Sequence, residues 1–415
     1  QKNNPVSKEG TIMSMIQVEE ALDTILSKIK FKGVEKVPLG QALGRVLAED
    51  VVSRVNNPPL DNSAMDGYAL IAEDIQSATP ENPVKLDVVE EIAAGYTAKG
   101  VLKPGQAMRI MTGAPIPSGA NAVLMQEDTQ KDSNAILCLD KADVDENIRM
   151  AGEDVKIGEE VIKKGTTLSP AHIGMMAVVG RSQIAVGQRP IVSILSTGDE
   201  ILELDETPEG PQIFNSNGHM LAAQIKSAGG IPVYLGIAKD TEKDLMEKFE
   251  SALKADVVVS SGGVSVGDYD LVKSSLQKMG QDMLFWKVAM KPGKPLAFGR
   301  IGDTPIFGLP GNPVSSFVSF EQFVRPSLRK TMGCSDLSHK TVQAKLTRTI
   351  HKKPGRLHFL SSIVSWADGE YTVTPAGEQG SGILKSAANA NGLLIFPLEA
   401  EEIKQGQEVA VQLLG

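Results

Sequence analysis

Two carboxylates and two adjacent glycines follow a run of apolar residues in the segment ADVVVSSGGVSVGDYD (255–270). The apolar run predicts a strand buried on both faces, and Gly262 and Gly263 would leave backbone N–H groups free to face a ligand. The G-G-x-x-x-G spacing lacks the Lys-Ser/Thr of a Walker A loop and is not G-x-G-x-x-G. A tight turn is the alternative, in which Asp268 and Asp270 would only cap the next helix.

Two further apolar segments end in acidic residues. SILSTGDE (193–200) ends at Glu200, and LGIAKD (235–240) ends at Asp240. Because ligands of open α/β sheets bind beyond the carboxyl ends of the strands, we expect Glu200, Asp240 and Asp270 to converge at one edge. Carboxylate oxygens at such an edge suit Mg²⁺, held together with waters and substrate phosphates.

A rigid turn follows another apolar segment, IFGLPGNPVSSF (306–317). Asn312 is a predicted helix N-cap, and Pro313 fits the first helical position. A plain helix start explains this pair but not the preceding Pro310-Gly311, so a ligand-binding turn is the favoured interpretation. Ser315 would either hydrogen-bond an oxyanion or bond the backbone.

Three lysines are concentrated in FWKVAMKPGKPLAFG (285–299). Lys287, Lys291 and Lys294 fall within eight residues, and the Pro-Gly pair between the last two rules out a helix that would scatter them. In a chain of net charge −9 this is a local cationic patch. It favours an anionic substrate, with an ordinary solvated surface as the alternative.

Other polar residues beside glycines are ambiguous when each is considered alone. They are Asp66, Thr112, Asp154, Arg356 and Ser381. Each fits a simple turn as well as a site. The five histidines are scattered without metal-ligand spacing, and no Ser-His-Asp or Cys-His arrangement is readable.

The elements that would position these residues change character along the chain. Strands alternate with amphipathic helices from 189 to 335, which predicts right-handed βαβ units on a parallel sheet. Short strands separated by Pro and Gly predict a small β domain over 59–148 and a small barrel or sandwich over 336–415. The fold class is therefore α/β plus all-β, in several domains.

The remaining segments predict a discontinuous linking domain made of 14–58 and 149–188. Helical spacing predicts a helix over 15–29 and a second over 39–52 that runs into a strand-like end. A further helix over 169–180 would be capped by Ser169 and carry Pro170 at its first position.

The composition is that of a soluble globular protein with 415 residues, 41% hydrophobic and 22% charged. The negative net charge argues against broad binding to nucleic acid or anionic membrane. Two cysteines, and the lack of a visible signal peptide or membrane-length apolar run, predict a cytoplasmic protein. Residues 1–13 read as a polar tail, with Met13 or Met15 a candidate natural start.

The ordered set of motifs resembles the MoeA family of molybdopterin molybdenumtransferases, which is related to the C-terminal domain of gephyrin. The motifs are DNSAMDGYA, RIMTGAPIP, GED, STGDE, SSGGVSVGDYD, FWKVAMKPGKP, GLPGNPVS, PGRLHF and GxQGS. The resemblance spans roughly 14–415, and its DNSAMDGYA phrase is similar to that of bacterial members.

The resemblance implies an elongated four-part subunit with a MogA-like α/β domain and a C-terminal β-barrel. It implies a homodimer whose cleft joins the α/β and C-terminal domains of one subunit to the β domain of its partner. The implied reaction inserts molybdate into adenylylated molybdopterin in the presence of Mg²⁺, which releases AMP. Molybdopterin adenylyltransferase and molybdoenzymes are the implied transient partners.

Roles follow from motif position. The resemblance implies activity-linked residues Asp66, Thr112, Asp154, Glu200, Asp240, Asp270, Lys287 and Lys291. It implies substrate-binding residues Gly262, Gly263, Ser265, Lys294, Pro310, Asn312, Pro313, Ser315, Arg356 and Ser381. It implies Mg²⁺ contacts from Glu200 and Asp270.

One stretch departs from the family pattern. Where the family usually carries Asp-Ser/Thr-Asn-Arg, this chain has FNSNGHM, with Asn215 for the acid and Gly218 for the arginine. The departure bears on nucleotide affinity. Two alternative functions stay open at this point, a gephyrin-type scaffold and the adenylyltransferase step itself.

Overall fold

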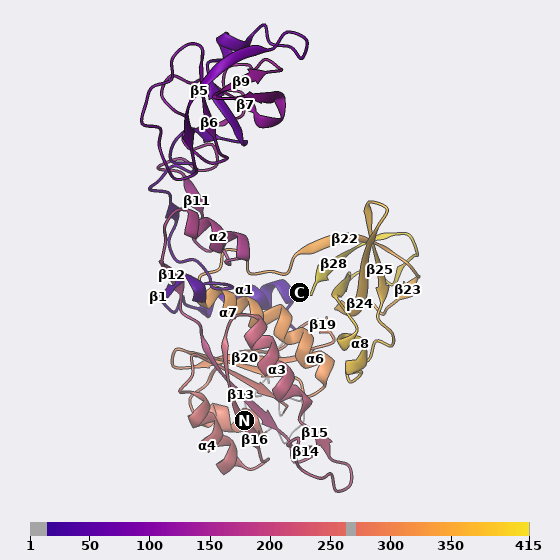
Figure 1. The fold of residues 1–415 in the computed structure, drawn as a ribbon. Helices are drawn as coiled ribbons and strands as arrows, with labels where there is room; N and C mark the ends of the chain where they lie inside the picture. Colours follow the sequence, from indigo (N-terminus) through magenta and orange to yellow (C-terminus); the bar gives the residue numbers. More distant parts are fainter. Residues whose placement is uncertain (1–14, 263–270, 415) are drawn as a thin grey trace, which may run out of the picture.

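The computed structural model describes residues 15–262 and 271–414, which form an elongated molecule (Figure 1). A small β-sheet lies at one end, a mixed α/β body at the other, and a barrel beside that body. A slender linking region joins the small sheet to the α/β body.

The linking region is built from two separate stretches of chain. Strand β1 (Val34–Pro38) pairs antiparallel with β12 (Gln183–Gly187), and β2 (Val51–Val52) pairs antiparallel with β11 (Glu160–Ile162). Helix α2 (Pro170–Val178) packs on these pairs, whereas α1 (Val18–Lys28) buries Ala21 and Ile25 in the core of the α/β body. The predicted cap of α2 is confirmed, because the Ser169 side chain accepts a hydrogen bond from the backbone N–H of His172.

The helix predicted over 39–52 is wrong. Only one turn forms there, η1 (Leu39–Gln41), and the chain then pairs with residues near 166–168. Gly44 takes φ +71° and donates its N–H to the Leu168 carbonyl, so the backbone leaves the helical region at that point. Two glycines within five residues weaken the helical preference enough for tertiary pairing to prevail.

The small β-sheet has the strand order β7-β4-β6-β5-β9-β8. Its strands are β4 (Gly67–Leu70), β5 (Val84–Ile92), β6 (Gln106–Ile110), β7 (Ala122–Met125), β8 (Thr129–Asp132) and β9 (Ala135–Cys138). Short turns η2 (Ala72–Ile75) and η3 (Gln126–Asp128) connect them, and β3 (Asn62–Ser63) pairs with β10 (Ile148–Arg149). The sheet encloses its own apolar core around Tyr68, Leu86 and Ile136.

The α/β body contains a six-stranded sheet of order β16-β13-β17-β21-β20-β18. Its strands are β13 (Ile191–Thr197), β16 (Ile231–Ala238), β17 (Val257–Ser261), β18 (Asp282–Lys287), β20 (Pro295–Ile301) and β21 (Thr304–Leu309). Its first four strands run parallel, as predicted, whereas β20 pairs antiparallel with both of its neighbours, β21 and β18. The difference arises because a two-residue turn joins β20 to β21 as a hairpin, which forces the two strands to run in opposite directions.

Helices cover both faces of this sheet. On one face α3 (Ser216–Ser227) packs with a continuous helical segment, α6 (Pro313–Ser319), a π-helical turn η4 (Phe320–Val324) and α7 (Arg325–Thr331). On the other face lie α4 (Glu242–Ala252) and α5 (Leu271–Lys278). A small parallel pair, β14 (Ile201–Leu202) and β15 (Ile213–Phe214), extends from the end of β13.

The C-terminal part is a closed five-strand barrel, which resolves the choice between barrel and sandwich. The strands β22 (Thr341–Leu346), β24 (Leu357–Ala367), β25 (Glu370–Pro375), β26 (Gly392–Phe396) and β28 (Glu408–Leu413) close through the β24–β26 pairing. A helix α8 (Leu384–Ala388) and the pair β23 (Ile350–His351) and β27 (Glu402–Ile403) complete it. Strand β19 (Met290–Lys291) comes from the α/β body but pairs with β24, so it ties the two parts together.

Within the described residues, no helix has the length and apolar character needed to span a membrane.

Candidate functional site

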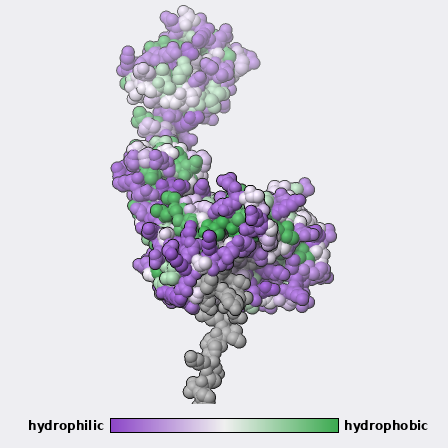
Figure 2. Space-filling view, turned by 90° about the horizontal axis from the view of Figure 1, so that it is seen from below, coloured by the Kyte–Doolittle hydropathy of each residue, from purple (hydrophilic) through white to green (hydrophobic). Residues whose placement is uncertain are grey.

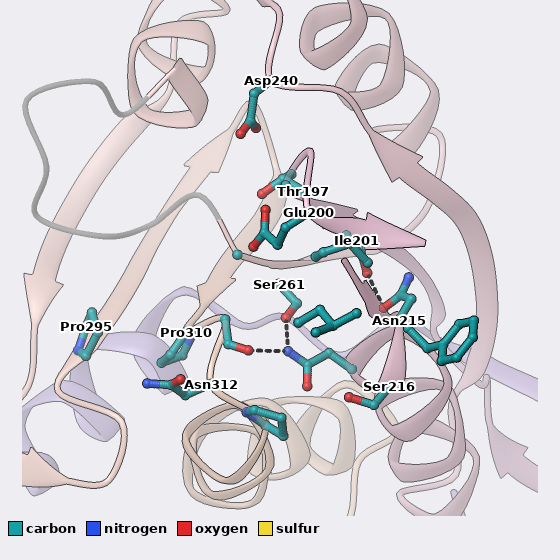
Figure 3. A pocket seen from close by; sticks show the side chains of 18 residues that line it. Thr197, Glu200, Ile201, Asn215, Ser216, Asp240, Ser261, Pro295, Pro310 and Asn312 are labelled. Carbon is teal, nitrogen blue, oxygen red and sulfur yellow. Dashed lines mark hydrogen bonds between the residues drawn. The ribbon is translucent and has the colours of Figure 1, made fainter. Parts of the chain in front are cut away.

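A cavity of about 450 Å³ lies where β13, β17 and β21 end (Figure 3). We call it the strand-end pocket and define it by the predicted site residues that line it, which are Glu200, Asp240, Gly262, Pro310, Asn312 and Pro313. The sequence expectation that several strand ends converge on one site is therefore met for the described residues. Gly263, Ser265 and Asp270 lie outside the described residues.

Three carboxylates, those of Asp199, Glu200 and Asp240, repel one another on one side of this pocket. Burial raises the pKa of Asp240, and the charges of Asp199 and Glu200 raise it further. The backbone N–H of Asp240 donates to Asp199 Oδ1 at 3.2 Å, which holds the two loops together. A hard cation would relieve this repulsion, and oxygen ligands are the type that Mg²⁺ prefers.

The carboxylate of Glu200 is folded back over the chain that carries it. A Cβ on Gly198 would lie 2.6 Å from Glu200 Oε2, and Gly198 has φ +141°. Glycine at 198 therefore gives the carboxylate its place in the pocket. Among residues 15–262 and 271–414 no three His, Cys, Asp or Glu side chains form a complete metal-ligand cluster. Glu200 and Asp240 could hold a hard cation only together with waters and substrate oxygens as its other ligands.

The role predicted for the Gly262 backbone is wrong. Its N–H donates to the Leu309 carbonyl at 3.2 Å instead of facing a ligand. A Cβ at 262 would lie 2.4 Å from the Thr197 carbonyl oxygen, and the residue has φ +90°. Glycine is needed here because β17 and β13 approach each other closely as they enter the pocket.

Asn217, which the sequence reasoning missed, connects three elements around the pocket. Its Nδ2 donates to Ser261 Oγ at 2.8 Å and to the Gly311 carbonyl at 2.7 Å (Figure 3). Its Oδ1 is buried without a partner, as is Thr197 Oγ1. Both residues line the pocket, so two buried polar atoms without a partner lie in its wall. The sequence signal for Asn217 is the asparagine pair of FNSN (214–217), which follows a short strand.

The departure at 215 and 218 is accompanied by a compensating tyrosine. Asn215 Nδ2 donates to the Tyr234 hydroxyl at 2.6 Å, and that hydroxyl donates to Glu203 Oε1 at 2.7 Å. A Cβ on Gly218 would lie 2.7 Å from Tyr234 Cε2, so the ring occupies the space where a side chain at 218 would begin. Burial and the Glu203 contact raise the pKa of Tyr234, which keeps the hydroxyl neutral. Asn215, Tyr234 and Glu203 thus form one hydrogen-bonded chain at the place where the sequence departs from the family pattern.

A second cavity of about 250 Å³ lies between the α/β body and the barrel. We call it the cationic pocket, and the polar side chains lining it are Lys291, Lys352, His358, Gln379 and Ser381. Its lining contains no described carboxylate. Burial lowers the pKa of Lys352, and the charge of Lys291 lowers it further, as expected for cations that share a site without an anion.

The two pockets share a wall at the start of α6. Asn312, which lines the strand-end pocket, donates from Nδ2 to Oγ of Ser381 in the cationic pocket at 3.3 Å. The backbone N–H of Val314 donates to the Ser381 carbonyl at 3.0 Å. The acids and the lysines therefore line two neighbouring cavities, whereas the sequence predicted a single one. Asn312 occupies the predicted N-cap position of α6 and Pro313 its first turn, but the Asn312 side chain makes no cap hydrogen bond.

Four predicted site residues of the α/β body and the barrel line neither pocket. Lys287 is half-buried on β18, Lys294 is exposed, Ser315 is buried within α6 and Arg356 is half-buried before β24. Lys352 and His358 line the cationic pocket instead. They lie on either side of the PGR motif that contains Arg356. Sequence spacing alone does not tell which of these neighbours faces inward.

Three predicted residues belong to the small β-sheet or its base: Asp66 precedes β4, Thr112 follows β6, and Asp154 lies between β10 and β11. The small sheet and the α/β body lie at opposite ends of the molecule (Figure 1). Asp66 accepts hydrogen bonds from Thr112 through its N–H and its hydroxyl, both at 2.7 Å, and these contacts lower the pKa of Asp66. Asp154 accepts one from Asn57 Nδ2 at 2.8 Å and lines a 540 Å³ hollow near the base of the small sheet. The structure brings Asp66 and Thr112 together, but not to the strand-end pocket.

Three family models match the chain in order. They are described as the MoeA N-terminal region (domain I and II) over 16–180, a probable molybdopterin binding domain over 193–330, and the MoeA C-terminal region (domain IV) over 343–414. Together the three models match most of the described chain.

Named relatives are similar over most of their length. Molybdopterin molybdenumtransferase 2 of Mycobacterium tuberculosis is 41% identical over 383 residues, which is 90% of this chain and 94% of that protein. Molybdopterin molybdenumtransferase of Bacillus subtilis is 36% identical over 96% of this chain and 94% of its own. The molybdopterin biosynthesis moeA protein of Pyrococcus horikoshii superposes with a TM-score of 0.83 at 35% identity, over 96% of this chain and 100% of that one.

Proposed function

The chain belongs to the MoeA family of molybdopterin molybdenumtransferases, and from this premise we propose that it inserts molybdate into adenylylated molybdopterin, releasing AMP and molybdenum cofactor. It is a transferase of molybdenum cofactor biosynthesis. One observation carries the proposal. An acidic, strand-end pocket and a cationic pocket meet across the Asn312–Ser381 contact, so two anionic groups can be held side by side.

The two pockets would have different roles, anion binding in the cationic pocket and metal binding in the strand-end pocket. Lys291 and Lys352 offset the repulsion between molybdate and the anionic pterin substrate, because each places a positive charge in a cavity that holds no described carboxylate. Glu200 and Asp240 would hold Mg²⁺ on the other side of the wall, with Asp270 still a sequence prediction. When bound, the metal neutralises phosphate charge and so favours departure of AMP.

We propose the domain division 14–58 with 149–188, 59–148, 189–335 and 336–415. The antiparallel pairs β1–β12 and β2–β11 support it, since each joins the first stretch of the linking region to the second. The proposed homodimer is supported by the position of Asp66 and Thr112, which can reach a strand-end pocket only in another subunit. Figure 2 shows apolar residues gathered over the middle of the molecule, where a partner would cover them.

Mixed dimers test the shared site directly. Asp66→Asn and Glu200→Gln chains are each expected to be inactive alone, because each breaks every site of its own homodimer. Co-expressed in equal amounts, they are expected to recover about a quarter of wild-type sites, since half the dimers are mixed and each has one intact site. Activity of the co-expressed mixture measures this, and mixed dimers isolated by tandem purification are expected to retain about half of the wild-type sites. A mixture as inactive as its parents would overturn the shared-site arrangement.

The reaction itself is tested with purified protein, adenylylated molybdopterin, Mg²⁺ and molybdate. AMP release that depends on molybdate is the expected result, and folded protein that releases none would refute the function. Two further arms separate the alternatives. Pyrophosphate release from ATP with unmodified molybdopterin would indicate an adenylyltransferase, and binding of receptor peptides without pterin binding would indicate a scaffold.

The remaining expectations are proposals of the same kind. We expect transient contacts with molybdopterin adenylyltransferase, which would supply the substrate, and with the molybdoenzymes that receive the product. A cytoplasmic location is expected for a chain that handles such intermediates.

A further inference from the structure

His358 occupies the floor of the cationic pocket beside a lysine. It lies on β24 directly opposite Lys291 on β19, so the two residues are neighbours across the strands that join the α/β body to the barrel. The residue is only 4% exposed, and its ring packs edge-on against Phe396 at a centroid distance of 6.1 Å. A titratable ring is therefore fixed next to the cation expected to meet molybdate.

The ring has one nitrogen without a partner. It forms a hydrogen bond to the backbone of Lys353, while Nε2 is buried and unpaired. The charged groups that act on it come from two elements, Lys291 on β19, and Lys352 and Arg356 on the loop before β24. No carboxylate of the described chain is among them. Buried polar atoms in native proteins almost always have partners, so this orphan atom calls for an explanation.

We propose that His358 is a proton-linked binding residue, which takes up a proton at Nε2 when a dianion enters the cationic pocket. The proton comes from bulk water, and no bond is broken in the anion. This inference rests on the proposed function, because it assigns molybdate to the cationic pocket. The resulting imidazolium adds a third positive charge beside Lys291 and Lys352, and it discriminates dianions from singly charged anions.

The direction of the pH effect follows from linkage. In the free protein burial lowers the pKa of His358, the Lys353 backbone contact partly offsets this, and the neighbouring cations lower the pKa again. The negative charge of a bound dianion stabilises the protonated ring, which opposes the effects of burial and of the neighbouring cations. The pKa of His358 is therefore higher in the complex than in the free protein. Anion binding therefore tightens as pH falls between the two values, by at most about tenfold in Kd per pH unit.

Calorimetry with the full-length protein and molybdate alone tests this. Titrations near neutral pH in two buffers of different ionisation enthalpy give the number of protons taken up per anion bound. Wild type is expected to take up a fraction of a proton, with a Kd that falls as pH falls. His358→Gln keeps a hydrogen-bonding side chain and is expected to bind without proton uptake and with a nearly flat Kd profile.

A matched control separates His358 from other histidines. His351 lies on the same barrel, but its side chain is 72% exposed and paired with Glu402 at 3.6 Å. His351→Gln is expected to leave proton uptake at the wild-type value. Should His358→Gln fail to fold, labelled-histidine NMR on wild type supplies the readout, with the His358 pKa expected to rise when molybdate is added.

The outcomes distinguish this inference from the proposed function. Molybdate binding without proton uptake, or with uptake retained in His358→Gln, overturns the role of His358 and leaves the function standing. Absence of molybdate binding at every pH, in protein shown to be folded, counts against the assignment of molybdate to this pocket and so against both.

Discussion

Replacing Glu200 by glutamine is expected to lower the rate of AMP release by about 10²–10³-fold while leaving the fold intact. The side chain is exposed and lines the strand-end pocket, so its loss removes no core packing. Glutamine keeps the shape but removes the charge that would neutralise a cation. It also removes one source of the repulsion that raises the pKa of Asp240. Steady-state turnover at saturating Mg²⁺ measures the loss.

The control for this variant is Glu209→Gln. Glu209 is an exposed acid in the loop between β14 and β15, and it lines no part of the strand-end pocket. It is expected to turn over at the wild-type rate. Equal rates for Glu200→Gln and Glu209→Gln, with unchanged Mg²⁺ dependence, would remove Glu200 from the site.

Replacing Lys291 by alanine is expected to raise the KM for molybdate by about 10–100-fold, with a smaller effect on the rate at saturation. Lys291 lines the cationic pocket, and no carboxylate of the described residues pairs with it. Its charge is therefore available to an anion. The same substitution removes one cause of the lowered pKa of Lys352, so some affinity is recovered from that neighbour. Initial rates over a molybdate titration measure the change.

Lys353→Ala is the matched control for charge. Lys353 is exposed, adjacent to Lys352, and its side chain does not line the pocket. A shift in molybdate KM equal to that of Lys291→Ala would show that only overall charge matters. The assignment of Lys291 to the anion would then fail.

Local sequence patterns were sufficient for the elements with long apolar periodicity. The strand at 257–261 and the alternating helices of the α/β body form as predicted, because their apolar residues face cores on both sides of one sheet. The helix expected over 39–52 fails because Gly44 leaves the helical region and the backbone finds partners near 166–168. Such pairing between distant segments leaves no mark in the local sequence.

The site was predictable in its chemistry and less so in its geometry. Strand ends identified Glu200 and Asp240, and the Pro-Gly kink identified Lys291. Lys352, His358 and Asn217 were missed, because their inward orientation depends on how β24 pairs with β19 and how α3 packs over the sheet. Glycine at 218 is explained by Tyr234, which lies on a separate strand and whose ring occupies the space where a Cβ at 218 would begin.

A crystal structure of the protein soaked with molybdate and AMP tests the central claim most directly. The account predicts a molybdenum anomalous peak between Lys291, Lys352 and Ser381. It also predicts the AMP phosphate on the other side of Asn312, beside Glu200 and Asp240. Molybdenum bound among the acids, or both ligands on surfaces that do not adjoin, would contradict it.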